Sequence, residues 1–339
     1  MGTDPRVAVM GRVARTPSGA LRFGYPGVTL RLVVTGSDVA LRASCSTGHC
    51  RLAVSVDGAP TRVVRLPAEQ GDLTLASGLG PGPHRVDIVH RTETWQGVVT
   101  VSGFVLPAGA DLAAPPPWPE RKLLFIGNSV TCGEGADRAS AAPGDTAASS
   151  DATHSYGMLL AAALGAQCHL VCYGGRGLMR DWRGRRDVLN APEFEPLALA
   201  VENERVAWDR HAYQPDAIVV SLGTNDFNLG LGPLPEEREF VGTYLVFLRA
   251  LRERYPAAKI AVTEGAIVND EADPARPQKA VLRRYLAATV RQLGDPGVVF
   301  LPARHYPGDA HNAHPTGEQH AAMARDLEGP LRDLVGWRE

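Results

Sequence analysis

A proline-rich run divides this chain of 339 residues into two parts with different sequence patterns. Residues 108–120 contain Pro115, Pro116, Pro117 and Pro119. Proline at this density cannot continue a helix or a central strand, because it lacks a backbone N–H and its ring fixes φ. The run therefore predicts a semi-rigid linker between a domain at residues 6–107 and a second domain at residues 121–339.

The part before the linker has the pattern of a β-domain. Short apolar or alternating runs are separated by turn signals such as Asp57-Gly58 and Gly80-Pro81-Gly82-Pro83. Helical periodicity is absent from this part. The expected strands are 30–34, 39–43, 52–56, 62–66, 85–89 and 97–101. Many short strands with frequent turns predict a β-sandwich or jelly roll.

After the linker, apolar strands alternate with helical segments. The expected strands are 122–126, 168–173, 217–222, 259–263 and 298–301, and the expected helices are 156–164, 236–255, 274–293 and 316–335. The last helix opens with a capping-box pattern from Thr316 to Gln319. This alternation predicts a five-stranded parallel sheet covered by helices on both faces. Active sites in such sheets lie beyond the carboxyl ends of the strands.

Residues suited to catalysis follow the expected strands. Ser129 comes at a strand-to-turn junction, and the glycine loop around Gly175 leaves backbone N–H groups unshielded. Asn225 offers fixed amide donors for an oxyanion, and His314 precedes the last helix. Each also has an ordinary explanation as a cap, a turn or a solvated loop residue. Because all four fall at strand ends of one sheet, together they indicate a catalytic site.

These segments resemble the blocks of the SGNH (GDSL-like) hydrolase superfamily. The matching segments are Gly127-Asn128-Ser129, Gly175, Gly223-Thr224-Asn225-Asp226 and His314-Pro315. The resemblance implies a flavodoxin-like α/β/α fold. It also implies an oxyanion hole made of the N–H groups of Ser129 and Gly175 and the side chain of Asn225. The superfamily usually has aspartate at position 128, and we expect Asn128 to preserve the turn.

A narrower resemblance is to carbohydrate esterase family 2. It is carried by the β-domain and by the segments Arg91-Thr92-Glu93, 129–133, 175–180 and 214–226. It implies a jelly roll joined to an SGNH domain, and an enzyme that removes acetyl groups from plant polysaccharides with a preference for 6-O-acetyl groups. Ser129 would be the nucleophile and His314 its base, with an acetyl-enzyme intermediate.

The group that orients the imidazole of the histidine is less clear from the sequence. The usual triad has aspartate three residues earlier, where this chain has His311. Relatives with aspartate two residues earlier would have it at Asn312. We therefore prefer a serine–histidine dyad oriented by the backbone carbonyl of Ala313. The side chains of Asn312 and Asp309 are the alternatives.

Three other functions compete with a carbohydrate deacetylase. A metal hydrolase has possible ligands in residues 305–320, but no HExxH or HxHxDH pattern is present. A non-catalytic carbohydrate-binding protein on the same fold would use tryptophans such as Trp95, Trp182 and Trp208, which are also ordinary core residues. An SGNH esterase or acyltransferase acting on a non-plant substrate is the third. We expect acetylated oligo- or polysaccharide as the partner, and no cofactor or metal.

Composition bears on partners and compartment. The net charge of −2 does not favour a nucleic-acid partner, and no apolar run approaches 18 residues, so we expect no membrane span. The first residues lack signal-peptide features. We expect a secreted or periplasmic protein whose signal peptide is absent from this sequence, with a cytoplasmic protein as the alternative.

The spacing of the cysteines does not decide whether the chain contains a disulfide. Cys45 and Cys50 are close enough in sequence to bridge a hairpin, and the alternative is five free thiols. Cys168 and Cys172 lie in one expected strand, roughly 13 Å apart, too far for a disulfide.

Overall fold

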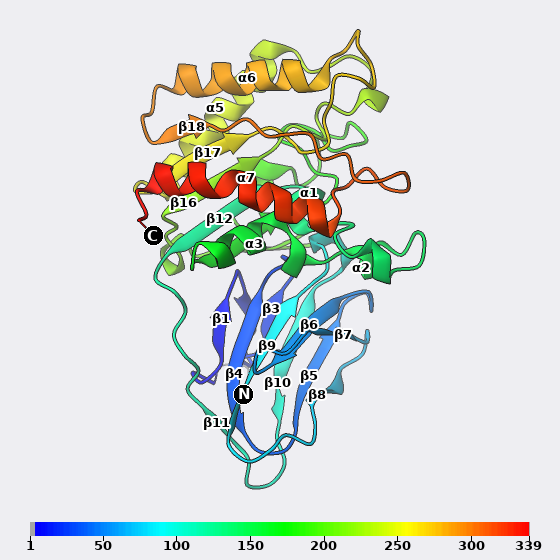
Figure 1. Cartoon of the computed structure of the whole chain (residues 1–339), viewed down its shortest axis with the longest axis vertical. Helices are drawn as coiled ribbons and strands as arrows, with labels where there is room; N and C mark the ends of the chain where they lie inside the picture. Colours follow the sequence, from blue (N-terminus) through cyan, green and yellow to red (C-terminus); the bar gives the residue numbers. More distant parts are fainter. Residues whose placement is uncertain (1–3, 339) are drawn as a thin grey trace.

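The computed structural model describes residues 4–338 and has an all-β part at one end and an α/β part at the other (Figure 1). The all-β part is a sandwich of two antiparallel sheets. One sheet contains β1 (Ala8–Met10), β4 (Thr29–Thr35), β9 (Pro83–His90), β6 (Arg51–Val56) and β7 (Arg62–Arg65) in that order, with β11 (Asp111–Ala113) paired to β4. The other contains β2 (Ala14–Arg15), β3 (Leu21–Phe23), β10 (Val99–Val105), β5 (Val39–Cys45) and β8 (Gly71–Ala76). The predicted sandwich is confirmed.

Alternating burial explains how the sandwich forms. In β4, Leu30, Leu32 and Val34 are fully buried, and the residues between them face outward. In β5 every second residue from Val39 is likewise buried. The two sheets therefore enclose one apolar core between their inner faces.

The proline-rich segment stays in contact with the sandwich before it enters the α/β part. The strand β11 lies inside residues 108–120 and pairs with β4. Trp118 then packs under the guanidinium of Arg31, whose Cζ lies 4.0 Å from the ring centroid. The chain between the two parts is thus held against the sandwich along much of its length.

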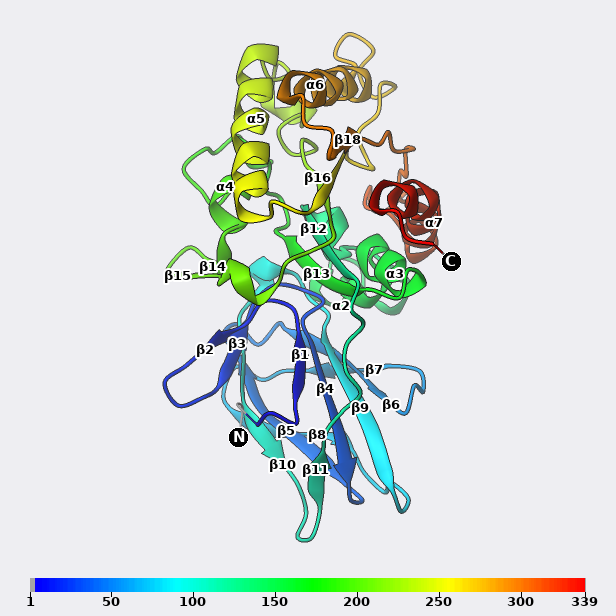
Figure 2. The same cartoon turned by 90° about the vertical axis from the view of Figure 1, so that its left-hand side faces the viewer.

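The α/β part is a five-stranded parallel sheet between two layers of helices (Figure 2). The strand order is β13 (Gln167–Cys172), β12 (Lys122–Gly127), β16 (Ala217–Ser221), β17 (Lys259–Thr263) and β18 (Val298–Phe300), which is flavodoxin-like. Helices α3 (Tyr156–Ala163) and α7 (Gly317–Val335) pack together on one face, and α5 (Glu237–Arg254) and α6 (Gln278–Leu293) on the other. Every residue of β16 is buried, as a covered parallel sheet requires.

Short elements connect these strands and helices, and several were not predicted. They are α1 (Ser129–Cys132), α2 (Thr146–Ser149), α4 (Ala191–Phe194), the hairpin of β14 (Leu197–Val201) and β15 (Glu204–Ala207), and the 3₁₀ turns η2 (Arg138–Ser140), η3 (Ala152–His154), η4 (Arg210–Ala212) and η5 (Leu229–Leu231). Another 3₁₀ turn, η1 (Thr94–Gln96), lies in the sandwich between β9 and β10. The capping box predicted for the last helix is present, with Thr316 accepting the N–H of Gln319.

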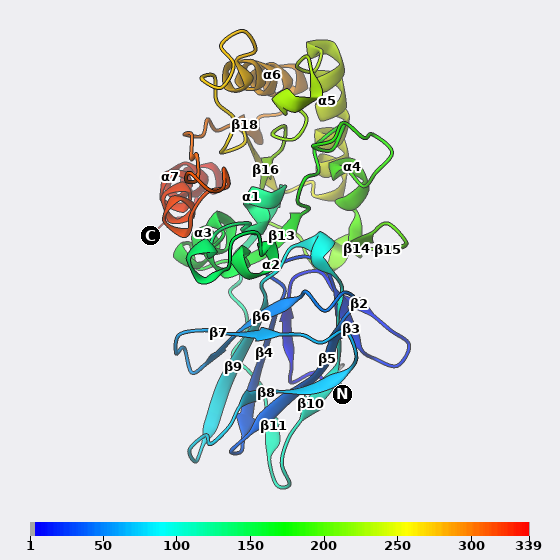
Figure 3. The same ribbon diagram turned by 90° about the vertical axis from the view of Figure 1, so that its right-hand side faces the viewer.

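The two parts share a continuous core. The cluster of buried apolar side chains that contains Tyr25 of the sandwich also contains Phe194 of the α/β part, and the Tyr25 hydroxyl donates to the Phe194 carbonyl at 2.6 Å. Buried Arg12 pairs with buried Glu195, 3.1 Å between nitrogen and oxygen. The turn between β9 and β10 lies at the end of the sandwich that faces the α/β part (Figure 3). Within this turn, Thr94 donates to the Cys172 carbonyl at the end of β13 at 2.7 Å.

Two disulfides are present, and one was not predicted. Cys45 and Cys50 are bonded, as the sequence allowed. Cys132 and Cys172 are also bonded, which joins α1 to the end of β13. The alternative of five free thiols is therefore wrong, and Cys168 is the free, buried cysteine.

Candidate active site

Ser129 lies where β12 meets α1, at the carboxyl end of a central strand. It is the first residue of α1, so its N–H has no partner within the helix. Asn128 caps the helix by accepting the N–H of Val130 at 3.1 Å, so the turn survives the change from aspartate as expected. A Cβ at Gly127 would come within 2.0 Å of the Thr131 hydroxyl, so only glycine fits this approach.

His314 meets Ser129 across the end of the sheet. Its Nε2 lies 2.8 Å from the serine Oγ, and its Nδ1 lies 2.8 Å from Oδ1 of Asn312. If Nδ1–H donates to Asn312, then Nε2 is free to accept the serine proton. The group that orients the imidazole in the structure is therefore the Asn312 side chain, and our preference for the Ala313 carbonyl was wrong.

Asp309 organises the histidine loop without touching the imidazole. Its Oδ1 accepts the N–H groups of His311 and Asn312 at 2.9 and 3.1 Å, and its Oδ2 pairs with Arg138 at 3.0 Å. Arg138 also donates to the carbonyl oxygens of Asn312 and His314. The role of Arg138 was not predicted, because it depends on contacts between loops far apart in sequence.

The charge state of His314 suits a general base. Burial lowers its pKa below the ordinary value, the nearby carboxylate of Glu134 raises it, and the charge of Arg138 lowers it. The net shift is downward, so the imidazole is neutral at neutral pH. A neutral imidazole can accept the proton of the nucleophile.

The predicted oxyanion donors gather at the same pocket. Ser129, Gly175, Asn225 and His314 all line it. One amide hydrogen of Asn225 donates to the Arg176 carbonyl at 2.7 Å, which fixes the orientation of the side chain and leaves its second hydrogen for the pocket.

Gly175 needs to be glycine for two reasons. Its φ is +74°, in the left-handed region, and a Cβ there would lie 2.6 Å from Cδ1 of Trp182. The loop that follows is held by buried Asp226, which accepts the N–H groups of Leu178 and Met179 at 2.8 and 2.7 Å. The sequence places Asp226 in a motif, but it did not predict that this carboxylate would hold the loop after Gly175.

The pocket is about 700 Å³ and its rim is aromatic and basic. Trp95 of the sandwich and Trp182 are 46% and 49% exposed, respectively, whereas Ser129 is only 6% exposed and lies deeper in the pocket. Arg183 lies over the ring of Trp182, with Cζ 4.7 Å from its centroid. Trp208, the third candidate for sugar stacking, instead packs against the core with the guanidinium of Arg12 over its ring.

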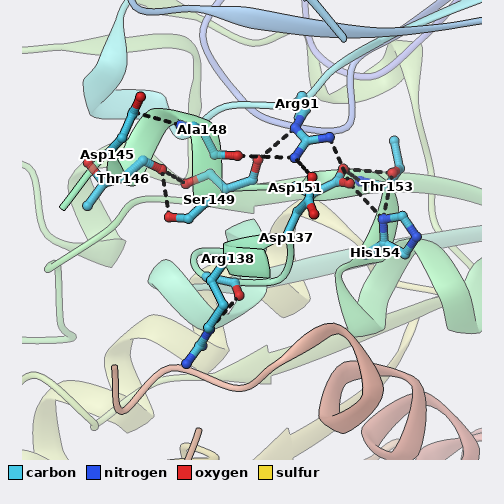
Figure 4. Close-up of polar contacts among 12 residues, drawn as sticks. Arg91, Asp137, Arg138, Asp145, Thr146, Ala148, Ser149, Asp151, Thr153 and His154 are labelled. Carbon is cyan, nitrogen blue, oxygen red and sulfur yellow. Dashed lines mark hydrogen bonds and ion pairs between the residues drawn. The ribbon is translucent and has the colours of Figure 1, made fainter. Parts of the chain in front are cut away.

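The loop after α1 is anchored to the sandwich through Arg91 (Figure 4). This arginine is 3% exposed and pairs with Asp137 and with Asp151, the latter at 3.1 Å. Its Nε donates to the Ser150 carbonyl at 2.9 Å. Since Arg138 follows Asp137 directly, the sandwich is linked through this loop to the loop that carries the histidine.

The possible metal ligands do not converge in the structure. Within residues 4–338, no group of three or more His, Cys, Asp or Glu side chains is placed to hold a metal ion. His320 is buried in α7, where its Nδ1 accepts the N–H of Tyr156 at 3.2 Å.

None of the helices in the part of the chain that the structure describes is long and apolar enough to span a membrane.

The fold and the serine–histidine pair define a hydrolase of the GDSL-like class. A model of the GDSL-like Lipase/Acylhydrolase family matches residues 125–322, and a model described as Carbohydrate esterase 2 N-terminal matches residues 9–116. The chain is 41% identical to an acetylxylan esterase / glucomannan deacetylase of Cellvibrio japonicus, over 99% of this chain and 90% of that protein. The chain therefore belongs to carbohydrate esterase family 2 and is a carboxylic ester hydrolase.

Solved structures agree with this assignment. The structure of a family two carbohydrate esterase from Cellvibrio japonicus matches with a TM-score of 0.93, covering 100% of this chain and 98% of that one, at 41% identity. A family two carbohydrate esterase from Clostridium thermocellum in complex with cellohexaose matches with a TM-score of 0.88 at 26% identity, covering 98% of this chain and 100% of that one. The chain spans 40% of a third relative, the cellulase/esterase CelE of Acetivibrio thermocellus, at 27% identity.

Proposed function

We propose that this chain removes O-acetyl groups from carbohydrate, of the acetylxylan or glucomannan type, with Ser129 as nucleophile and His314 as base. The observation that carries the proposal is the 2.8 Å contact between Ser129 Oγ and His314 Nε2 at the floor of the pocket. The similarity to an acetylxylan esterase / glucomannan deacetylase supports the substrate class.

The mechanism follows from this geometry. His314 takes the proton of Ser129 as the hydroxyl oxygen attacks the acetyl carbonyl. The oxyanion is held by the N–H groups of Ser129 and Gly175 and by the free amide hydrogen of Asn225. The imidazolium then gives its proton to the departing sugar oxygen, and water hydrolyses the acetyl-enzyme in the second half of the cycle. Asn312, not a carboxylate, keeps the imidazole in the productive tautomer.

The depth of the nucleophile supports a primary acetyl group as the substrate. Ser129 is almost fully buried, while Trp95 and Trp182 stand exposed around the opening. A sugar ring stacked at this rim is held away from the floor. An acetyl group on the exocyclic O6 reaches further from the ring than one on a ring carbon, so we propose 6-O-acetyl groups as the preferred substrate.

The test is release of acetate from acetylated glucomannan and acetylated xylan, with Ser129→Ala as the control. We expect release from polysaccharide by the parent chain and none above background by the variant. Nuclear magnetic resonance of the residual polymer should show 6-O-acetyl signals disappearing first. Hydrolysis of 4-nitrophenyl acetate without release from either polysaccharide would retain the esterase and reject the carbohydrate substrate.

We also propose that the protein works in an oxidising compartment, secreted or periplasmic. The support is the pair of disulfides Cys45–Cys50 and Cys132–Cys172. Thiol titration of the denatured chain, purified without reductant, should find one thiol, that of Cys168. Five thiols in protein isolated from its native source would favour the cytoplasm.

A further inference from the structure

Two carboxyl groups meet beside the proposed base. Glu93, in the turn of the sandwich before η1, is fully buried. Its carboxyl group interacts electrostatically with that of Glu134, which follows α1 and lines the pocket. Oε2 of Glu134 lies 3.4 Å from Nε2 of His314. Among residues 4–338, no arginine or lysine forms an ion pair with either carboxyl group.

Burial decides which of the two carboxyl groups keeps a proton. It raises the pKa of Glu93 well above the ordinary value, and the charge of Glu134 raises it further. The other groups within reach of Glu93 are the Trp95 indole and the Gly174 N–H. Glu93 is therefore the member of the pair that keeps a proton, and Glu134 is the member that faces His314.

The base needs a nearby negative charge, and its usual source is missing. When His314 accepts the serine proton it becomes a cation, which an aspartate at Nδ1 stabilises in a standard triad. Here Nδ1 meets neutral Asn312, and Asp309 is occupied by Arg138 and by two backbone N–H groups. Glu134 is the carboxylate that contacts the imidazole.

We propose that Glu134 supplies the charge that stabilises the His314 cation, and that Glu93 of the sandwich holds the shared proton that keeps one negative charge on the pair. Glu134 takes no proton during turnover. The serine proton moves to Nε2 as the Oγ–C bond forms, and from Nε2 to the sugar oxygen as the acetyl C–O bond breaks. Glu134 is thus a positioning residue that acts through the histidine. The proposal rests on the proposed roles of Ser129 and His314.

Other charged groups face this cluster and enter its pH dependence. Those that act on His314 are Glu134 and Arg138, and His314 in turn acts on His320 of α7. Asp309 is paired with Arg138. Tyr173 follows β13, and its ring lies under the guanidinium of Arg176. Burial raises the pKa of the Tyr173 hydroxyl, and a negative charge on Glu93 raises it further.

The first test is the pH profile of Glu134→Gln, with 4-nitrophenyl acetate as substrate. We expect the maximum of kcat/KM to fall several-fold, because the imidazolium loses a nearby negative charge. We also expect the acid limb to move to lower pH, because removing the carboxylate lowers the pKa of His314. A lower maximum with an unmoved limb would indicate a merely structural role and overturn the proposal, as would an unchanged profile.

A charge-matched control is available on the same side of the molecule. Glu318, exposed in the first turn of α7, lies four residues after the histidine and does not line the pocket. Glu318→Gln removes the same charge and should leave both the maximum and the limb unchanged. An equal shift in this variant would show that net charge, and not the contact with His314, determines the pH at which the acid limb of kcat/KM lies.

The second test addresses the shared proton. Glu93→Gln keeps a neutral N–H donor toward Glu134, and we expect kcat/KM within about twofold of the parent value. Glu93→Ala removes the donor and should lower it several-fold. Thermal unfolding checks that both variants fold. Equal losses in two folded variants would overturn the role of Glu93.

The readouts separate this proposal from the proposed function. The assay uses a small ester, so an unshifted limb in Glu134→Gln rejects the charge role while the parent chain still releases acetate from polysaccharide. Failure of the carbohydrate substrate would appear in the parent chain itself.

Discussion

The α/β part and the sandwich reach the pocket by different routes. The α/β part brings Ser129, Asn225 and His314, each of which follows a different strand of one sheet. The sandwich brings only the turn around Arg91 and Trp95, between β9 and β10. The first set contains residues to which we assign the chemistry, whereas Arg91 holds the loop after α1. The comparison teaches that a domain can brace a site without supplying the residues proposed as nucleophile, base and oxyanion donors.

The largest effect should come from the reacting pair itself. Ser129→Ala and His314→Ala should each lower kcat on 4-nitrophenyl acetate more than about 1000-fold, because each removes a member of one functional unit. The double variant should be little worse than either single variant. Full activity in either single variant would contradict the assignment, and additive losses would contradict their acting together.

Asn225→Ala tests the electrostatic contribution of the α/β part. We expect a loss of about 10²–10³ in kcat with little change in KM, since the donor acts mainly on the oxyanion. Steady-state kinetics on the same ester measure both constants. A rise in KM with kcat unchanged would place the side chain in ground-state binding instead.

Arg91→Met tests the support from the sandwich. It leaves Asp151, which is 1% exposed, without its arginine partner, so the free energy of unfolding should fall by about 3 kcal/mol. Chemical denaturation measures this change, and kcat should fall in the folded protein as the loop loosens.

A matched surface variant sharpens that result. Arg42→Met breaks an exposed pair with Asp72 in the same domain and should leave the free energy of unfolding nearly unchanged, because water screens such pairs. If the two variants lose the same stability, Arg91 is no more than another surface ion pair, and the comparison between supporting and reacting regions fails.

Smaller effects should distinguish the groups behind the histidine. Asn312→Ala should lower kcat about tenfold by freeing the tautomer of His314, since it removes the acceptor at Nδ1. Asp309→Ala should cost only a few-fold, because it touches the loop and not the ring. The reverse order, measured on 4-nitrophenyl acetate, would make Asp309 the orienting group.

The parent pH profile should show the smallest effect. Burial, the largest cause, lowers the pKa of His314 from 6.5, so the imidazole stays neutral into mildly acidic solution. The half-maximum of the acid limb of kcat/KM should therefore fall below pH 6.5. A half-maximum above pH 6.5 would mean that nearby carboxylates outweigh burial.

The positions of the reacting residues could be predicted because strand order determines them. Ser129, Gly175, Asn225 and His314 each follow an apolar run, and the parallel sheet brings the ends of those runs to one edge. Sequence position alone was enough to place them together, and their roles as nucleophile, base and oxyanion donors stay predictions.

What could not be predicted depends on loop conformation and on contacts between distant segments. From the sequence, either the Ala313 carbonyl or the Asn312 side chain could orient the imidazole, and only the backbone of residues 309–314 decides between them. The disulfide Cys132–Cys172 follows from the pairing of β12 with β13 across 40 residues. The burial of Arg91 and Glu93 depends on how the sandwich docks.

The most direct test of the account is to trap the acetyl-enzyme. The chain is mixed with excess 4-nitrophenyl acetate, quenched in acid within the first turnovers, digested and analysed by mass spectrometry. The account predicts a single acetyl group on the peptide that contains Ser129, and none on that peptide in Ser129→Ala. Continued turnover by Ser129→Ala, or an acetyl group on another side chain that turns over at the rate of hydrolysis, would contradict it.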